Sequence, residues 1–394
     1  MSAILVLGWV SVVAACGGDD EGDPGPADGG GIQDVTRADG RVNDAAAQDA
    51  PRETGGSDLT DAVALANCAL FANADKPIEK LTATGCVDPA NPKNPAAFMI
   101  PYEVNSPLWS DGADKARFMS IPDGTKIHVI DCATETTACS TDPFTGVDGH
   151  WNYPVGTVMM KIFSFEGTTI ETRLLMNYGD GRWLGYSYQW NQEQTEALVL
   201  PDARRQSTFL VGASRRSQEW NYPSRADCTM CHTAYAGDTL GTETAQLNRM
   251  EASENQLDRL ERLGILDAAL RRLPPLPIPT GPGGTLEDRA RSYLHANCSF
   301  CHRPDGPLVA PDFRFTSPFD FKKMGVCDVP PSKGDVGAGG NARLLVPEHP
   351  EYSVIALRMK DLDLARMPQL ASYRVDTLGV KAIEDWISSV TACP

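Results

Sequence analysis

Two pentapeptides, Cys228-Thr-Met-Cys231-His232 and Cys298-Ser-Phe-Cys301-His302, follow the same pattern, and the rest of the chain is organised around them. On a helical turn, cysteines three residues apart lie on one face. The histidine, four residues after the first cysteine, lies on that face too. A planar group can therefore meet two thiols and one imidazole at once, so each pentapeptide predicts a helical segment that ends at such a group.

This spacing is typical of the covalent attachment of c-type haem. The thiols form thioethers with the haem vinyl groups, and the imidazole becomes the proximal ligand of the iron. A thioredoxin-like redox pair would require a βαβ context, and a zinc site would require further Cys or His ligands close by. Neither context flanks the motifs. We therefore predict two haems, one bound by Cys228, Cys231 and His232 and the other by Cys298, Cys301 and His302.

The chain of 394 residues is long enough for two or three domains and is acidic, with 52 acidic and 35 basic residues and a formal net charge of −17. Phosphate binding draws its affinity from clustered Lys and Arg, so this charge argues against a nucleic-acid partner. It favours a redox partner with a basic docking face, although the same charge also serves solubility.

The first fifteen residues form an apolar run that ends in Val13-Ala-Ala-Cys16. Residues 1–15 resemble a lipoprotein signal peptide, and Cys16 is the predicted lipidation site. No Lys or Arg precedes Cys16, which departs from the usual pattern, and the run is too short to span a bilayer. Residues 16–60, rich in Gly, Asp, Ala and Pro, are expected to form a disordered acidic linker. The chain is therefore predicted to be exported and lipid-anchored to the outer membrane, facing the periplasm or the cell surface.

Six cysteines remain after the lipid and haem sites are assigned. In an exported protein they predict three disulfides. Proximity in the sequence favours Cys68 with Cys86 and Cys132 with Cys139, which leaves Cys327 with Cys393.

Residues 61–215 are predicted to form a β-rich, sandwich-like domain, because alternating apolar segments are separated by Gly and Asp turns. The turn Tyr178-Gly-Asp-Gly181 between two of these segments predicts a hairpin. Tyr186, Tyr188 and Trp190 would share one face of a strand, more in keeping with core packing than with a surface platform. The expected strands lie within residues 126–130, 157–165, 169–178 and 183–190.

The remainder is predicted to be mainly α-helical, which makes the chain an α+β protein of several domains. Residues 216–280 form a first haem-binding segment, in which apolar residues at helical spacing predict a helix over 244–273. Residues 281–394 form a second haem-binding domain. Thr285 and Asp288 make a capping-box start for a helix that leads into the second motif. Asp376 or Thr377 caps a last helix, whose apolar stripe is Leu378, Ile383, Trp386, Ile387 and Val390.

The order helix, Cys-x-x-Cys-His, loop, methionine and closing helix in residues 281–394 resembles a class I cytochrome c domain. The resemblance implies Met367, in Arg366-Met367-Pro368, as the distal ligand of the second haem, with Met359 and Met324 as alternatives. For the first haem Met250 is the methionine candidate, although packing in a core is the commoner role of such a residue. Other candidate ligands are His295, Met176, Met159, His150 and His128. Alternatively, the sixth position of the first haem is open.

From about residue 97 to its end, the chain resembles a family of bacterial diheme c-type cytochromes with an N-terminal β domain and a C-terminal class I cytochrome c-like domain, many of them predicted lipoproteins. The resemblance implies two covalent haems at the two motifs and supplies no substrate. An insertion around Cys132 and Cys139 departs from the family. The matching segments are Asn105–Phe118, Tyr153–Thr157, Glu171–Leu175, Trp190–Ala197, Tyr222–Cys228 and Tyr293–Cys298.

Electron transfer by a membrane-tethered diheme cytochrome is therefore the leading hypothesis. A diheme peroxidase or oxidase, with an open site at the first haem, is an alternative that the unassigned sixth ligand leaves open. A third hypothesis is a binding module, in which the β domain recognises a glycan, a surface polymer or a partner dehydrogenase and the haems serve as an electron port.

Overall fold

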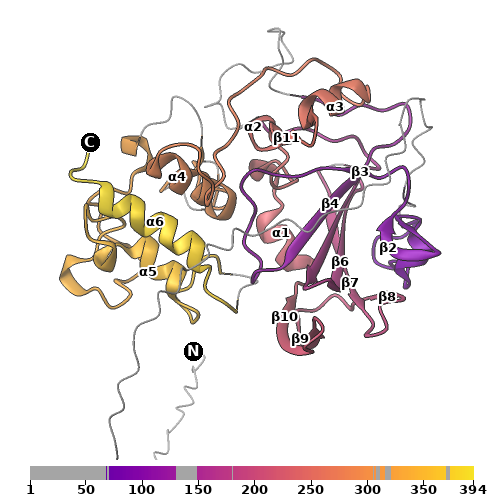
Figure 1. The fold of residues 1–394 in the computed structure, drawn as a ribbon, viewed down its shortest axis with the longest axis horizontal. Helices are drawn as coiled ribbons and strands as arrows, with labels where there is room; N and C mark the ends of the chain where they lie inside the picture. Colours follow the sequence, from indigo (N-terminus) through magenta and orange to yellow (C-terminus); the bar gives the residue numbers. More distant parts are fainter. Residues whose placement is uncertain are drawn as a thin grey trace, which may run out of the picture. The chain divides into compact units, whose positions relative to one another are not determined.

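The computed structural model describes residues 68, 71–129, 149–179, 181–304, 306–307, 311–315, 321–369 and 373–394. They belong to one compact unit, Leu59–Pro394. Helices and strands are mixed, as expected of an α+β chain (Figure 1). The predicted signal peptide, Cys16, most of the linker and the pair Cys132–Cys139 lie outside the described residues.

The largest element is a six-stranded antiparallel sheet in the order β3-β4-β5-β6-β7-β8. The other described strands form three two-stranded sheets, so the β region has one dominant layer where a sandwich would have two of similar size. The sheet comprises β3 (Ile100–Pro101), β4 (Asp114–Ser120), β5 (Val158–Phe165), β6 (Thr168–Asn177), β7 (Trp183–Trp190) and β8 (Ala197–Val199). The small sheets pair β1 (Val87–Asp88) with β2 (Asn91–Pro95), β9 (Arg205–Val211) with β10 (Arg216–Tyr222) and β11 (Met250–Glu251) with β12 (Glu254–Asn255).

The sheet buries both faces, because successive side chains point to opposite sides. Met159 and Met160, neighbours on β5, belong to two different apolar clusters. Tyr186, Tyr188 and Trp190 are at most 2% exposed and pack with Cys68 and Phe71, which confirms their predicted core role. The predicted hairpin is also present, since β6 and β7 pair through the glycine-rich turn.

Six α-helices and five 3-10 segments complete the described part of the chain. The helices are α1 (Arg225–Cys231), α2 (Thr244–Leu247), α3 (Gln256–Arg262), α4 (Leu286–Cys298), α5 (Val354–Lys360) and α6 (Thr377–Ser389). The 3-10 segments are Leu81–Thr84, Ala234–Ala236, Phe321–Met324, Gly339–Asn341 and Pro350–Tyr352. The predicted long helix over 244–273 was wrong. It is broken by the β11–β12 hairpin, where Ala252 has a positive φ of 46° and Asn255 caps α3 through the Leu257 amide.

Local capping signals were predicted correctly. Thr285 and Asp288 form the capping box of α4, and the Asp376 carboxylate accepts from the Gly379 amide at the start of α6. Two of the three predicted disulfides are also present, Cys68–Cys86 and Cys327–Cys393. The second joins Cys393, which follows α6, to Cys327, which forms a β-bridge with Leu345.

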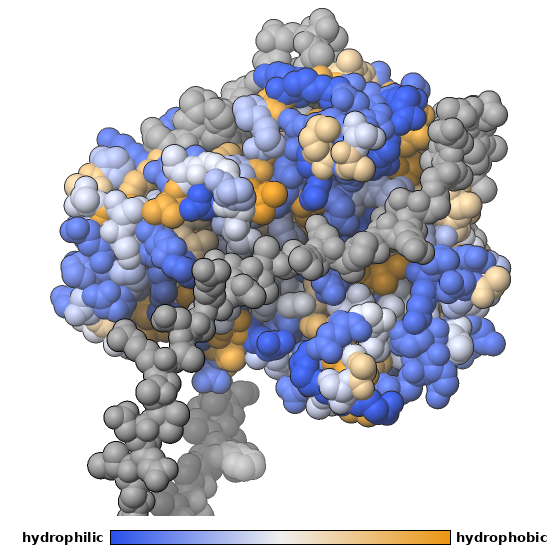
Figure 2. Space-filling view, viewed as in Figure 1, coloured by the Kyte–Doolittle hydropathy of each residue, from blue (hydrophilic) through white to orange (hydrophobic). Residues whose placement is uncertain are grey.

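Helices α4 and α6 pack against each other on a shared core that includes Ile383, Trp386 and Ile387. The predicted stripe fails at Leu378, which is 63% exposed. Close approach of the two helices depends on Gly379, because a Cβ there would lie 2.3 Å from Cε2 of the Tyr293 ring. The face of the molecule in Figure 2 is largely polar, with apolar side chains scattered over it.

We predict that Gly379→Ala destabilises the protein by about 1–3 kcal/mol, because the added methyl group must displace the packed Tyr293 ring. Chemical denaturation measures the change. Gly283→Ala is the matched control, because its Cβ would meet nothing within 4 Å, and it should change stability by less than about 0.5 kcal/mol. Equal stability of the two variants would contradict the close helix contact.

Candidate functional site

The first motif lies on α1, which follows directly from β10. Ser224 and Asp227 form a capping box that starts the helix, and Arg204 pairs with the Asp227 carboxylate. The helix packs on the sheet at Gly185 of β7, where a Cβ would lie 2.6 Å from the Cys228 Sγ. Gly185 therefore makes room for the first thiol of the motif.

His232 ends this helix with its ring orientation fixed. Its Nδ1 lies 2.6 Å from the Asp238 carbonyl oxygen, and a carbonyl can only accept, so Nδ1 carries the proton. Burial and the nearby Lys161 lower the pKa of His232 to about 3, which keeps the imidazole neutral. A neutral imidazole whose Nδ1–H donates to a carbonyl oxygen, and whose Nε2 keeps its lone pair free for a metal, is the usual form of a metal-ligating histidine.

The second motif begins at the end of α4. The His302 amide donates to the Cys298 carbonyl oxygen at 2.9 Å. The centroid of the His302 ring lies 5.2 Å from the centroid of the Phe313 ring. Burial and then Arg358 lower the pKa of His302 to about 4. Its Nδ1 is buried without a hydrogen-bond partner among the described residues.

The four motif cysteines are free thiols with raised pKa values. Burial, followed by the neighbouring Cys301, raises the pKa of both Cys231 and Cys298 to about 12. Redox-active Cys-x-x-Cys pairs have a lowered thiol pKa instead. The raised pKa values therefore argue against thiol–disulfide exchange at these motifs.

The two motifs are adjacent in space although they lie far apart in sequence. The Cys301 Sγ is 4.0 Å from the carbonyl oxygen of Met230, which is inside the first motif. Groups attached at the two motifs would therefore lie next to each other.

A cavity opens beside His232. One wall is the charged centre of the sheet face formed by β4, β5 and β6, and another belongs to α4. The lining residues include Lys115, Arg117, Lys161, Arg173, Arg303, His150, His232, His295, Glu243, Ser299 and Phe300.

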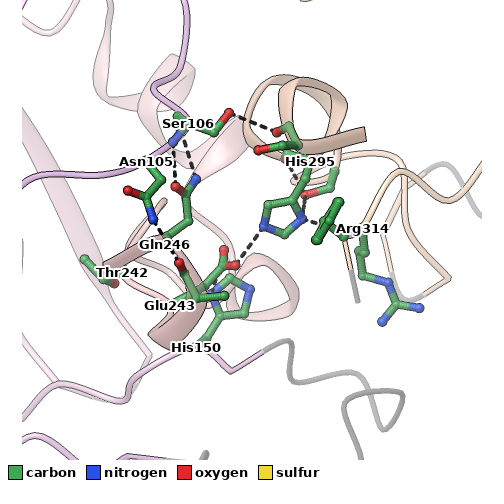
Figure 3. Close-up of polar contacts among 12 residues, drawn as sticks. Asn105, Ser106, His150, Thr242, Glu243, Gln246, His295 and Arg314 are labelled. Carbon is green, nitrogen blue, oxygen red and sulfur yellow. Dashed lines mark hydrogen bonds and ion pairs between the residues drawn. The ribbon is translucent and has the colours of Figure 1, made fainter. Parts of the chain in front are cut away.

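Glu243 lines this cavity, and it lies between the side chains of His150 and His295 (Figure 3). Its carboxylate is 2.7 Å from His295 Nε2 and 3.6 Å from His150 Nδ1. The Phe315 amide donates to His295 Nδ1 at 3.0 Å, so Nε2 of that ring carries the proton given to Glu243. Burial alone would raise the pKa of Glu243, but the two histidines and Arg303 outweigh it and lower the pKa to about 2.

The residues predicted as distal ligands of a first haem differ in whether they line the cavity beside His232. His150 and His295 line the cavity with His232. Met250, in contrast, is 65% exposed in the β11–β12 hairpin and does not line the cavity, so its predicted role as a distal ligand is not supported. His128 pairs with Asp267 at the surface, while Met159 and Met176 lie in apolar clusters.

Met367 is half-buried in the loop between α5 and α6. Its amide donates to the Arg358 carbonyl oxygen at 3.0 Å, and Arg358 is the cation that lowers the pKa of His302. The alternatives Met359 and Met324 are buried in the apolar core around α4 and α6.

Sequence reasoning missed the charged lining of the cavity. Lys115 and Arg117 alternate along β4, a pattern that places both on one face, but only the strand register brings Lys161 and Arg173 beside them. Glu243 gave no sequence signal, because its two histidine partners come from residues 150 and 295.

We predict that Gly185→Ala impairs loading of the first motif, because the new methyl group would occupy the space of the Cys228 thiol. The ratio of haem to chain should fall from two towards one in a pyridine haemochrome assay. Gly340→Ala, whose Cβ would meet nothing within 4 Å, is the control. An unchanged ratio in both variants would show that the approach of α1 to β7 tolerates the methyl group.

No protein-family model, curated protein or solved structure matched the chain. Within the described ranges, no cluster of three or more His, Cys, Asp or Glu side chains suited to a metal ion is present. No described helix has the length and apolar character needed to cross a membrane. The functional assignment therefore rests on the residues of the two motifs and of the cavity beside them.

Proposed function

We propose that this chain is a c-type cytochrome with two covalent haems that transfers electrons between redox partners. The observation that carries the proposal is the contact between the two Cys-x-x-Cys-His motifs, at Cys301 and Met230. Haems attached side by side would exchange electrons within the chain, so that one could receive an electron and the other could deliver it. The proposal places the chain with the bacterial diheme cytochromes that it resembles.

Each haem would be held by groups already in suitable chemical states. Cys228 and Cys231 would supply the thioether sulfurs of the first haem. His232 would bind the iron through Nε2, because its Nδ1 is hydrogen-bonded to the Asp238 carbonyl oxygen. Cys298, Cys301 and His302 would do the same for the second haem. The bound haems supply a one-electron iron couple, whose potential depends on axial ligands and burial.

The sixth ligands are proposed from position. For the first haem we assign His150, because it lines the same cavity as His232 and packs against Gly237, in the loop that carries the Asp238 carbonyl. For the second haem we assign Met367, because its amide donates to the carbonyl oxygen of Arg358, the residue whose charge lowers the pKa of His302. A thioether ligand would give the second haem the higher potential.

The cellular setting follows from the sequence and is part of the proposal. Several acyl chains on Cys16 and an acidic linker would tether the protein to the outer membrane. The net charge of −17 suits a redox partner with a basic docking face.

A diheme peroxidase or oxidase is the second candidate, and Glu243 favours it. Glu243 is a buried carboxylate that lines the same cavity as His232, where a proton-transfer group of such an enzyme would have to lie. The two functions differ in the first haem, which would be high-spin and open in an enzyme and low-spin in a carrier.

We predict two low-spin haems in the oxidised protein, and we expect His150→Ala to convert one of them to a high-spin haem that binds carbon monoxide. EPR and visible absorption spectra measure both properties. His128→Ala is the control, because that histidine lies at the surface against Asp267. A high-spin haem in the wild-type protein would support the enzyme, and unchanged spectra of His150→Ala would remove His150 as the ligand.

We predict that Met367→Ala abolishes the weak near-infrared sulfur-to-iron absorption band and lowers one of the two midpoint potentials, because the thioether ligand is lost. Met359→Ala should keep the band, since Met359 packs in the core. Retention of the band in Met367→Ala, with both potentials unchanged, would contradict the assignment.

A further inference from the structure

Three cations lie directly opposite one another on the sheet wall of the cavity. In the strand register, Arg117 of β4 faces Lys161 of β5, and Lys161 faces Arg173 of β6. All three line the cavity that contains His232. We call them the cationic ladder.

Directly opposed like charges destabilise a sheet, so the ladder needs compensating anions. The two outer members have them. Arg117 pairs with Glu103 at 2.7 Å, and Arg173 pairs with Glu171 at 2.8 Å. Lys161, at the centre, forms no ion pair with any residue of the described ranges.

Glu243, the acidic residue in the cavity lining, is already engaged by histidines. Glu243 accepts from His295 and faces His150, so it serves the histidine side of the cavity. Lys115 and Arg303 add further positive charge to the lining. Burial, together with Arg117 and Arg173, lowers the pKa of Lys161 to about 7, as expected of a cation without a bound counter-charge.

The concentration of positive charge is unexpected for this chain. The whole protein carries a formal charge of −17, yet five Lys and Arg side chains line one cavity with a single acidic residue. Cations held together inside an acidic protein indicate a site for an anion.

We propose that the cationic ladder, with Lys161 at its centre, binds a carboxylate or small oxyanion in the cavity. Two sources share this chemistry: the propionate groups of the first haem, in which case the inference rests on the proposed function, and a free inorganic oxyanion. In both cases the anion supplies a counter-charge for Lys161, which lies between Arg117 and Arg173.

Lys161→Met in the full-length, matured protein tests the site, because Met has a similar length and lacks the charge. Lys161→Arg keeps the charge, and Lys93→Met removes a charge from an exposed lysine. Three quantities are measured for each variant: haem per chain, the two midpoint potentials, and the melting temperature with and without sodium phosphate at constant ionic strength.

If haem propionates occupy the site, Lys161→Met should lower one midpoint potential and reduce the melting temperature by about 2 °C or more, while phosphate leaves the wild type unchanged. If a free oxyanion occupies it, phosphate should raise the melting temperature of the wild type and of Lys161→Arg, and have no effect on Lys161→Met. Lys93→Met should behave as the wild type throughout.

The proposal is overturned if Lys161→Met melts at or above the wild-type temperature, with unchanged potentials and no phosphate effect in any variant. Removal of Lys161 would then only relieve repulsion within the ladder. Haem content separates this result from a failure of the proposed function, because a chain without haem still reports phosphate binding through its melting temperature.

Discussion

The close packing of α1 on strand β7 is the constraint on which the rest of the site depends. Gly185 has no Cβ, so the Cys228 thiol can lie directly against the sheet. This contact sets the position of the first motif and directs His232 into the cavity in front of the charged sheet face. It also leaves Met230 at the surface, where it meets Cys301 of the second motif.

One face of the sheet changes character along its strands. At one end Met119, Met159 and Leu175 enter an apolar core, and at the other end Phe163 packs with Trp220. Between these ends the same face presents Arg117, Lys161 and Arg173. Apolar burial at both ends stabilises the sheet, so its centre can carry charges whose burial would otherwise be unfavourable.

Local signals in the sequence were reliable. The capping boxes, the hairpin at residues 178–181 and the order of helices around the second motif depend on neighbouring residues, and the structure has them. Periodicity alone misled over residues 244–273, because Leu247, Leu257 and Leu260 reach one core from two short helices separated by a hairpin. That error also placed Met250 on a helix face, whereas it is exposed.

The cavity could not be read from the sequence because its walls come from distant segments. His150, Glu243 and His295 meet only after the sheet and α4 have packed, and the ladder depends on the register of three strands. Cys327 and Cys393 were paired only because the cysteines closer together in the sequence had been paired first. The structure contains this disulfide.

The central claim is that both motifs carry covalent haem, and intact mass after expression with a c-type haem maturation system tests it most directly. We expect the chain to gain the mass of two haems, and to gain only one when Cys298 and Cys301 are both replaced by alanine. A chain whose mass matches the polypeptide alone under the same conditions would contradict the account.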